Sequence, residues 1–373
     1  MQNHDLVCKI ALGLIPGVGD INARKLVSAT GSVEAVFREP YGNLIKIPGI
    51  GDTMARSVID KKYLAQAEKE AAFVTSKKIT TLFYLDDDYP QRLKECTDSP
   101  VMIYYLGNGD LDAVKMLSIV GTRKATTRGK DLCEDLVSQL AAMFPDLVIV
   151  SGLAYGIDIT AHKAALNNGI KTVAVLAHGL RTIYPPVHTA IARKMVTRGG
   201  LLTDFISDAP AEKNNFLKRN RIIAGLSPAL LVVESGVKGG ALVTAEMALS
   251  YNRDVMATPG RPTDNWSGGC NRLIKRNIAA LVENASDICE FLNWAKPESL
   301  SPKQPKLFEN LDKNESDLLR IISCEESLTI DQISQLYGQP VNKISSVLLS
   351  LELKGAIKCC PGNAYIKCDN VIM

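Results

Sequence analysis

Five short apolar runs between residues 116 and 257 restrict the possible folds of this chain more than any other feature. They are residues 116–120, 147–150, 172–176, 229–233 and 254–257, and stretches of helical length with one apolar face lie between them. A strand that is apolar on both sides must be covered on both faces, and helices in the connections provide that cover in a parallel sheet. We therefore predict an α/β core with a parallel sheet between two layers of helices.

Turns rich in glycine follow several of the predicted strands. In open α/β sheets, ligands bind beyond the carboxyl ends of the strands, so these turns mark the expected binding edge. Gly121-Thr122-Arg123 joins a strand to a predicted helix at 127–142, and Lys238-Gly239-Gly240 precedes another helix. Exposed amides and cations at such positions can hold an anion. Neither turn has the glycine spacing of a dinucleotide-binding or P-loop motif, so both of those classes lose support.

The segment 213–225 is basic and contains no acidic residue. Phe216 and three asparagines, among them Asn220, are interspersed with its cations, which are Lys213, Lys218, Arg219 and Arg221. Cations that bind phosphates beside an aromatic ring that stacks on a base are typical of sites for single-stranded nucleic acid. The alternative is a solvated helix face, with Ile222, Ile223 and Leu226 anchoring the helix and the basic residues facing outward.

The residues that could suggest catalysis or metal binding favour structural roles. Ser151 is not in a nucleophile elbow, and Asp158 and His162 stand four residues apart on one predicted helix, where a helix cap and an internal hydrogen bond are expected. His178 and His188 are expected to pack in a loop. The nine cysteines include no C-x-x-C pair and the histidines number four. We predict no catalytic residue, no cofactor and no metal.

The first 75 residues are predicted to form a separate helical domain of the helix-hairpin-helix (SAM-like) type. Residues 14–19 and 46–51 are similar Gly-containing turns, and each precedes a helix, beginning at Asp20 and Asp52, where a carboxylate opposes the helix dipole. Such hairpins grip the nucleic-acid backbone. The alternative is that these glycines only shape tight corners between helices.

The chain after the core, which we assign to residues 76–296, is predicted to be a linker followed by a winged helix. Residues 297–310 contain three prolines, which is typical of a linker. Three amphipathic helices and two strands, 356–360 and 364–368, then form a winged-helix-like domain over 311–373. Its third helix carries Lys343 as one cation near its start, so contact with protein is as well supported as contact with DNA.

The overall charge and hydropathy exclude several classes. A net charge of +3 is too small to attract a polyanion, so nucleic-acid binding would require locally clustered cations. The sequence has no apolar stretch long enough to span a membrane and no signal-peptide pattern at its start. We expect a cytoplasmic protein with no membrane partner.

Several motifs occur in a fixed order along the chain. They are Ser118-Ile-Val-Gly-Thr-Arg123, Ser151-Gly-Leu-Ala followed by Gly156-Ile-Asp158, Ala161-His162, Thr172-Val-Ala-Val-Leu176, Tyr184-Pro185, Arg219-Asn-Arg-Ile-Ile-Ala-Gly-Leu-Ser227, Ala257-Thr-Pro-Gly260 and Gly268-Gly-Cys-Asn-Arg-Leu-Ile274. Together they resemble the DNA-processing protein A family (DprA, also called Smf). The resemblance covers most of residues 116–282, and the predicted flanking domains fit the longer members of the family.

The resemblance implies a Rossmann-like core and a specific function. Family members are homodimers that bind incoming single-stranded DNA during natural transformation, protect it, counter single-strand-binding protein and load RecA recombinase. They are not known to catalyse a reaction. Carried over by motif, the DNA-binding residues would be Gly121, Thr122, Arg123, Lys213, Phe216, Arg219, Asn220, Arg221, Lys238, Gly239 and Gly240.

The sequence departs from the family pattern at three places, and two other functions are possible. Lys238-Gly-Gly-Ala241 replaces a common Ser-Gly-Ser and adds a cation, while Thr203-Asp204 and Asn277-Ile278 replace Ser-Glu and Gly-Ala. A Rossmann-like phosphoribohydrolase of nucleoside monophosphates has similar turns, but residues 234–246 lack its Pro-Gly-Gly-x-Gly-Thr pattern. A protein scaffold with a basic docking face is the third possibility.

Overall fold

The computed structural model describes residues 2–295, 312–323, 327–354, 356–360 and 363–367. The chain divides into two compact units, Met1–Lys296 and Pro297–Met373. The predicted linker at 297–310 lies outside the described residues. Among the described residues, no helix is both long enough and apolar enough to cross a bilayer.

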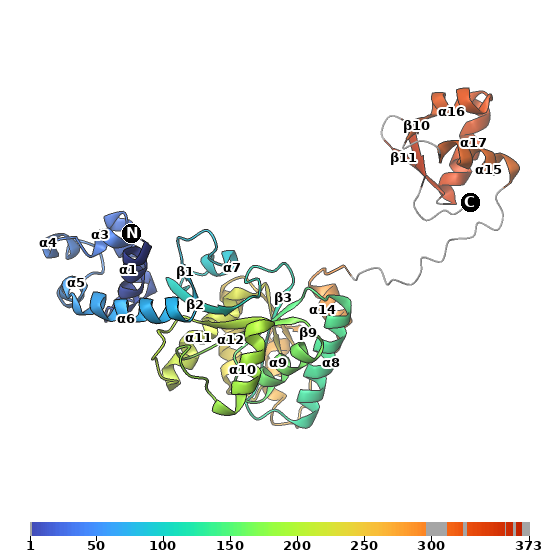
Figure 1. Ribbon diagram of the computed structural model, residues 1–373. Coiled ribbons are helices and arrows are strands. Elements are labelled where there is room, and N and C mark those ends of the chain that lie inside the picture. The colour runs from blue at the N-terminus through green and yellow to red at the C-terminus, as the bar shows by residue number, and fades with distance from the viewer. Residues whose placement is uncertain (1, 296–311, 324–326, 355, 361–362, 368–373) are drawn as a thin grey trace. The chain divides into compact units, whose positions relative to one another are not determined.

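A nine-stranded sheet forms the centre of the first unit, in the order β1-β2-β6-β5-β4-β3-β7-β8-β9 (Figure 1). The strands from β6 to β9 pair in parallel, and the five predicted runs are β3, β4, β5, β7 and β8, which confirms the parallel core. β1 and β2 add an antiparallel edge beside β6 that the sequence did not predict. The bounds are β1 (Thr80–Phe83), β2 (Met102–Gly107), β3 (Met116–Val120), β4 (Val148–Ser151), β5 (Lys171–Val175), β6 (Gly199–Thr203), β7 (Ala229–Val232), β8 (Asp254–Ala257) and β9 (Ala280–Leu281).

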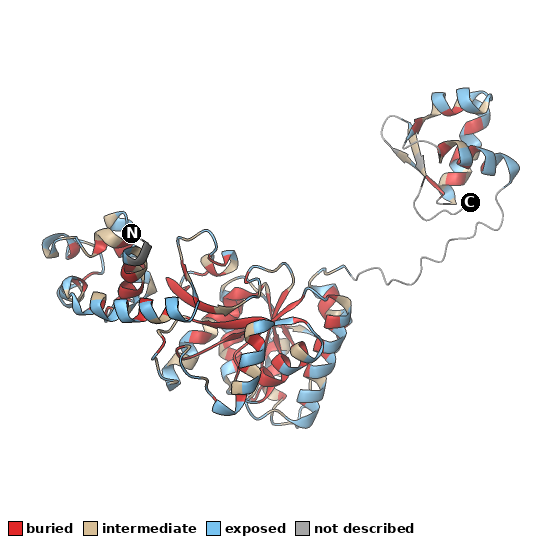
Figure 2. Cartoon of the chain, viewed as in Figure 1, coloured by how far each residue is buried: buried red, intermediate tan, exposed pale blue. Residues whose placement is uncertain are grey.

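Helices cover both faces of this sheet, as the apolar strands require. In β3, Leu117 and Ile119 pack with α8, α9 and α14, whereas Met116 and Val120 pack with α11, α12 and α13. The red strands in Figure 2 mark this doubly buried sheet. The bounds are α7 (Gln91–Lys94), α8 (Thr127–Met143), α9 (Ile157–Asn167), η1 (Pro186–His188), α10 (Thr189–Thr197), α11 (Lys213–Leu226), α12 (Gly240–Ser250), α13 (Gly268–Lys275) and α14 (Ala285–Phe291).

The N-terminal helices share a hydrophobic core with the antiparallel edge of the sheet. Phe83, Met102 and Tyr104 from β1 and β2 are buried in the same cluster as apolar residues of these helices. The helices are therefore joined to the sheet through a common core rather than through a polar contact alone. Their bounds are α1 (Gln2–Leu14), α2 (Asp20–Thr30), α3 (Val33–Val36), α4 (Tyr41–Leu44), α5 (Asp52–Ile59) and α6 (Lys62–Ser76).

The second unit is a winged helix. Its strands form a small sheet in the order β10-β12-β11. A capping box formed by Thr329 and Gln332 stands at the start of α16. Glu315 is buried in this unit and accepts hydrogen bonds from Lys354 Nζ and Ser350 Oγ, each at 2.6 Å. The elements are α15 (Lys313–Ile322), β10 (Leu328–Thr329), α16 (Ile330–Tyr337), α17 (Val341–Leu353), β11 (Ile357–Cys360) and β12 (Ala364–Lys367).

Candidate nucleic-acid interface

The candidate site is a groove at the centre of the sheet's carboxyl edge. β3 lies between β4 and β7, so the connections that leave these strands diverge here, as they do at the ligand-binding switch point of open α/β sheets. The groove has a volume of about 550 Å³, and the residues that follow β3, β4 and β7 line it together with α11 and the start of α12. The sheet topology therefore brings together turns that are distant in the sequence.

The Gly121-Thr122-Arg123 turn is held tightly at the end of β3. The Thr122 N–H donates to the Glu234 carbonyl at 2.7 Å, and the Thr122 carbonyl accepts from the Ile157 N–H at 3.3 Å. A Cβ at position 121 would lie 2.5 Å from Ile157 Cγ1, so no larger residue fits there. This close packing between β7 and α9 directs Arg123 out of the sheet and into the groove.

Arg123, Phe216 and Tyr184 form a stack on one side of the groove. The Arg123 guanidinium carbon lies 4.7 Å from the centre of the Phe216 ring, and the Tyr184 ring meets Phe216 edge-on at 5.9 Å. A cation held on an aromatic face gains electrostatic attraction while its remaining N–H groups can still reach a phosphate. Lys213, exposed at the start of α11, lines the same groove. The cations and the ring predicted from sequence are thus neighbours.

Arg219 forms the floor of the groove and is only 3% exposed. Its Nη1 donates to the Val175 carbonyl at 2.7 Å, and its Nε has no partner among the described residues. Burial lowers the pKa of Arg219 to about 10, although nearby Asp158 raises it. Burial likewise raises the pKa of the Asp158 carboxyl, which Arg219 opposes. Arg219 thus places a guanidinium charge at the base of the groove, where it attracts an incoming anion.

The start of α12 supplies backbone and charge to the same groove. Gly239 caps this helix, Gly240 is its first residue, and exposed Lys238 precedes them. Because both residues at this helix start are glycines, a phosphate can approach the backbone N–H groups closely. At the start of α8, in contrast, the Glu234 carboxylate already accepts from Thr126 N at 2.9 Å and Thr126 Oγ1 at 2.6 Å. An internal anion therefore occupies that second helix start.

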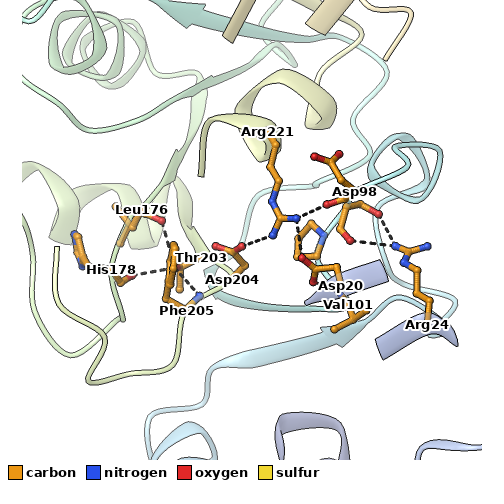
Figure 3. Close-up of polar contacts among 12 residues, drawn as sticks. Asp20, Arg24, Asp98, Val101, Leu176, His178, Thr203, Asp204, Phe205 and Arg221 are labelled. Atoms are coloured by element: carbon orange, nitrogen blue, oxygen red, sulfur yellow. Dashed lines mark hydrogen bonds and ion pairs between the residues drawn. The ribbon is translucent and has the colours of Figure 1, made fainter. Parts of the chain in front are cut away.

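The structure brings ten of the eleven predicted site residues into the lining of this groove. Its lining contains four cations and one carboxylate, so the local charge is strongly positive although the chain is nearly neutral. Arg221 is the exception, since it lies on the other side of α11 and pairs with Asp20 and Asp204 (Figure 3). The ten are Gly121, Thr122, Arg123, Lys213, Phe216, Arg219, Asn220, Lys238, Gly239 and Gly240.

One expectation about α11 needs correction. The alternative of a solvated helix face had its basic residues pointing outward, but Arg219 is buried and Arg221 is largely enclosed by its ion pairs. Ile222, Ile223 and Leu226 do anchor the helix in the core, as expected. The physical reason is that partners from other segments enclose these two side chains, the Val175 carbonyl for Arg219 and the Asp20 and Asp204 carboxylates for Arg221.

Sequence reasoning missed several residues of the groove. Tyr184, Ser235 and Trp266 also line it, and Tyr184 is 45% exposed. The Tyr184-Pro185 motif was a signal for this position, although it was used only to identify the family and not to assign a site residue. Trp266 follows no recognisable motif, and its ring lies 3.3 Å from where a Cβ on Gly236 would stand. Only the folded chain places it beside the β7 turn.

The histidines have the structural roles that the sequence favoured. His162 Nδ1 lies 2.7 Å from Thr172 Oγ1, which donates to the Ile149 carbonyl, so His162 donates in turn to Thr172. His178 Nε2 accepts from the Tyr184 N–H at 3.1 Å, and His188 Nδ1 lies 2.8 Å from the Leu153 carbonyl. His178 and His188 therefore fix the loops that carry the groove residues.

The two N-terminal hairpins pack on one another. Gly17 and Gly49 have φ values of +80° and +88°, and a Cβ at Gly49 would lie 3.1 Å from Lys25 Nζ. The carboxylates at the helix starts have internal partners, Arg221 for Asp20 and Arg56 for Asp52. These contacts favour the packing role of the glycines over an open phosphate site.

Comparisons with known proteins identify relatives for each part of the chain. Residues 80–293 match the family model described as DNA recombination-mediator protein A, residues 299–363 match a DprA winged helix domain, and residues 8–71 match a helix-hairpin-helix motif. The chain is 32% identical to a putative DNA processing protein DprA of Mycobacterium tuberculosis, over 90% of this chain and 88% of that protein. It is 38% identical to protein Smf of Escherichia coli over 75% of each.

Two solved structures are also similar. DNA processing protein A from Streptococcus pneumoniae has a TM-score of 0.64 at 30% identity and covers 78% of this chain and 97% of its own. DNA processing protein A from Helicobacter pylori has a TM-score of 0.52 at 28% identity and covers 58% and 96%, and its structure is described as giving insight into a single-stranded DNA binding mode.

Proposed function

This chain belongs to the DNA recombination-mediator protein A (DprA/Smf) family, and we propose that its central groove binds single-stranded DNA without a catalytic step. The observation that carries this proposal is the gathering of Arg123, Lys213 and Arg219 with Phe216 in one groove. Cations beside an aromatic ring bind phosphates and stack on bases without reading sequence.

In this proposal each wall has a distinct task. Arg123 and Lys213 at the rim neutralise backbone phosphates, and Arg219 at the floor receives a phosphate that enters deeply. The start of α12 with Lys238 holds a neighbouring phosphate. Bases stack on the aromatic side formed by Phe216 and Tyr184, and each stacked base contributes about 1–3 kcal/mol. Affinity then depends steeply on salt and little on sequence.

The wider role in this proposal follows the family resemblance. The protein acts in the cytoplasm as a homodimer, protects incoming single strands during natural transformation, counters single-strand-binding protein and loads RecA. Support for a recombination role comes from the family model over residues 80–293. Support for the DNA ligand comes from the single-stranded DNA binding described for the Helicobacter pylori relative.

The phosphoribohydrolase alternative is weakened by the carboxylates. Among the described residues that line the groove, Asp158 is the one acid, and it lies buried beside Arg219. Glu234 is engaged by Thr126 at the start of α8. A catalytic carboxylate must reach the reacting sugar, which neither group can do from these positions. Release of free base from a nucleoside monophosphate would nevertheless establish the alternative directly.

The test is a salt series of oligonucleotide binding measured by fluorescence anisotropy. Four groove cations predict a slope of log K against log [salt] of roughly −3 for a single strand. Arg123→Gln and Lys213→Gln should each weaken binding and flatten the slope by about 0.7. Lys218→Gln is the matched control, since this exposed cation of α11 lies outside the groove lining. Unchanged affinity and slope in both groove variants would refute the site.

A further inference from the structure

α11 is a shared wall between two cavities. Phe216 and Asn220 face the groove, whereas Lys218 and Arg221 face a second cavity of about 640 Å³ between the core and the N-terminal helices. Leu217 lines both cavities. Positions three and four apart share a helix face, which explains how one short segment serves two sides. Any shift of this wall changes the width of both cavities.

Arg221 fixes that wall from behind (Figure 3). Its Nη1 donates to Asp20 Oδ2 and its Nη2 to Asp204 Oδ2, both at 2.7 Å, and Nη1 also donates to the Asp98 carbonyl. The Arg221 side chain is 13% exposed and that of Asp204 is 8% exposed. Removing one partner of an ion pair that is shielded from water is strongly destabilising, because it leaves an uncompensated buried charge.

The Asp20 partner belongs to the N-terminal helices. Asp20 is the first residue of α2, and its other oxygen, Oδ1, accepts from the Val101 N–H at 2.8 Å. Arg24, one turn later, donates from Nη2 to Ser99 Oγ at 2.6 Å. The start of α2 is therefore connected to β2 and to α11 at the same point. Burial lowers the pKa of Arg221, but Asp204 and Asp20 outweigh it and the pKa is raised, so the guanidinium stays charged.

We propose that Arg221 is a positioning residue that couples the docking of the N-terminal helices to single-stranded DNA binding in the groove. It holds α11 in the position at which Lys213, Phe216 and Asn220 reach the strand, and Asp20 transmits the state of the N-terminal helices to it. This inference rests on the proposed function. Coupling is reciprocal, so bound DNA must stabilise the contact at Asp20 by the same free energy by which that contact strengthens DNA binding.

The test compares two variants of the full chain. Asp20→Asn keeps an acceptor for the Val101 N–H but removes the ion pair with Arg221. Lys9→Met is the matched control, because Lys9 also joins the N-terminal helices to the core, through Asp86 at 2.9 Å, without touching α11. Asp20→Asn should weaken oligonucleotide binding about tenfold with an unchanged salt slope, since no phosphate contact is lost. Lys9→Met should bind as the unaltered protein does.

Hydrogen exchange provides the readout that a purely structural role would not move. A saturating oligonucleotide should slow exchange at α2 and at Val101 in the unaltered protein and in Lys9→Met, but not in Asp20→Asn. Without DNA, Asp20→Asn should speed hydrogen exchange in α11. This measurement does not depend on whether the groove binds DNA. If Asp20→Asn does not fold, Arg221→Lys replaces it, because lysine lacks the two terminal nitrogens that hold Asp20 and Asp204 separately.

The outcomes separate the inference from the function on which it rests. If the unaltered protein shows no salt-dependent binding of the oligonucleotide, the proposed function is contradicted. Hydrogen exchange in α11 would still report on the ion pair between Asp20 and Arg221. A folded Asp20→Asn variant with unchanged affinity, or with unchanged exchange in α11, would overturn the coupling. A flattened salt slope in that variant would also overturn it, because Arg221 would then act on phosphate directly.

Discussion

Replacing Gly152 by alanine should damage the floor of the groove. A Cβ at this position would lie 1.8 Å from Arg219 Nη1 and 2.6 Å from Asp158 Oδ2. Gly152 is not among the residues with positive φ, so the missing space, and not backbone strain, excludes a side chain. The guanidinium would have to leave the Val175 carbonyl, which it now meets at 2.7 Å.

The expected loss of stability follows from these contacts. Overpacking a buried site and breaking a buried charged hydrogen bond together should lower the free energy of unfolding by about 3 kcal/mol. Both tryptophans, Trp266 and Trp294, belong to the unit Met1–Lys296, so denaturation followed by tryptophan fluorescence reports on that unit alone. Gly240→Ala is the matched control, because its Cβ would have Asn220 Nδ2 as its nearest atom at 4.0 Å. It should change stability by less than about 0.5 kcal/mol.

A double-mutant cycle checks the cause. If the clash with Arg219 is responsible, Gly152→Ala should cost less than about 1 kcal/mol when Arg219 is already alanine. Equal effects of Gly152→Ala in both backgrounds would refute the explanation, and so would a fully stable Gly152→Ala protein. The single variant should also bind single-stranded DNA at least tenfold more weakly, since Arg219 loses its position.

Three other changes test separate parts of the structure. Burial, with Arg219 and His188 nearby, lowers the pKa of His162 to about 3, so the unfolded chain takes up a proton below pH 6.5 that the native protein does not. The free energy of unfolding should therefore decrease by about 1.4 kcal/mol for each unit by which the pH is lowered below 6.5. In acid denaturation, His162→Gln should show a smaller decrease. Tyr184→Ala should weaken oligonucleotide binding by about 1–3 kcal/mol at an unchanged salt slope; a flattened slope would assign Tyr184 to phosphate contact. Burial raises the pKa of Glu315, but the hydrogen bonds from Lys354 and Ser350 outweigh it and the pKa is lowered, so its stabilisation is present above pH 4.5 and lost at lower pH. Glu315→Gln should lower the melting temperature of the winged helix in far-UV circular dichroism at pH 7, and an unchanged transition would contradict this role.

The sequence was most informative where the physical constraint was strong. Strands such as β3 must be buried on both faces, so their apolar runs revealed the parallel sheet, and the turns at their carboxyl ends revealed Arg123 and Lys238. β1 and β2 escaped prediction because they pair at an antiparallel edge, where burial depends on the N-terminal helices. That dependence involves contacts between distant segments, which no local pattern encodes.

The site residues illustrate the same limit. Arg219 and Arg221 are two positions apart in one basic motif and look equivalent in the sequence. On the helix they point to different cavities, and the partners that decide their roles, the Val175 carbonyl for one and Asp20 for the other, come from distant segments. Trp266 shows the converse, since its place in the groove follows from the fold of residues 258–267 and not from any motif.

The most direct test of the groove is photochemical cross-linking of a single-stranded oligonucleotide that carries 5-iododeoxyuridine, followed by identification of the attached peptides. Because this base reacts with aromatic side chains that it stacks against, we predict cross-links at Phe216, Tyr184 or Trp266. These links should disappear at high salt and become weaker in Lys213→Gln. Cross-links confined to the N-terminal helices or to the winged helix would contradict the assignment of the groove as the DNA-binding site.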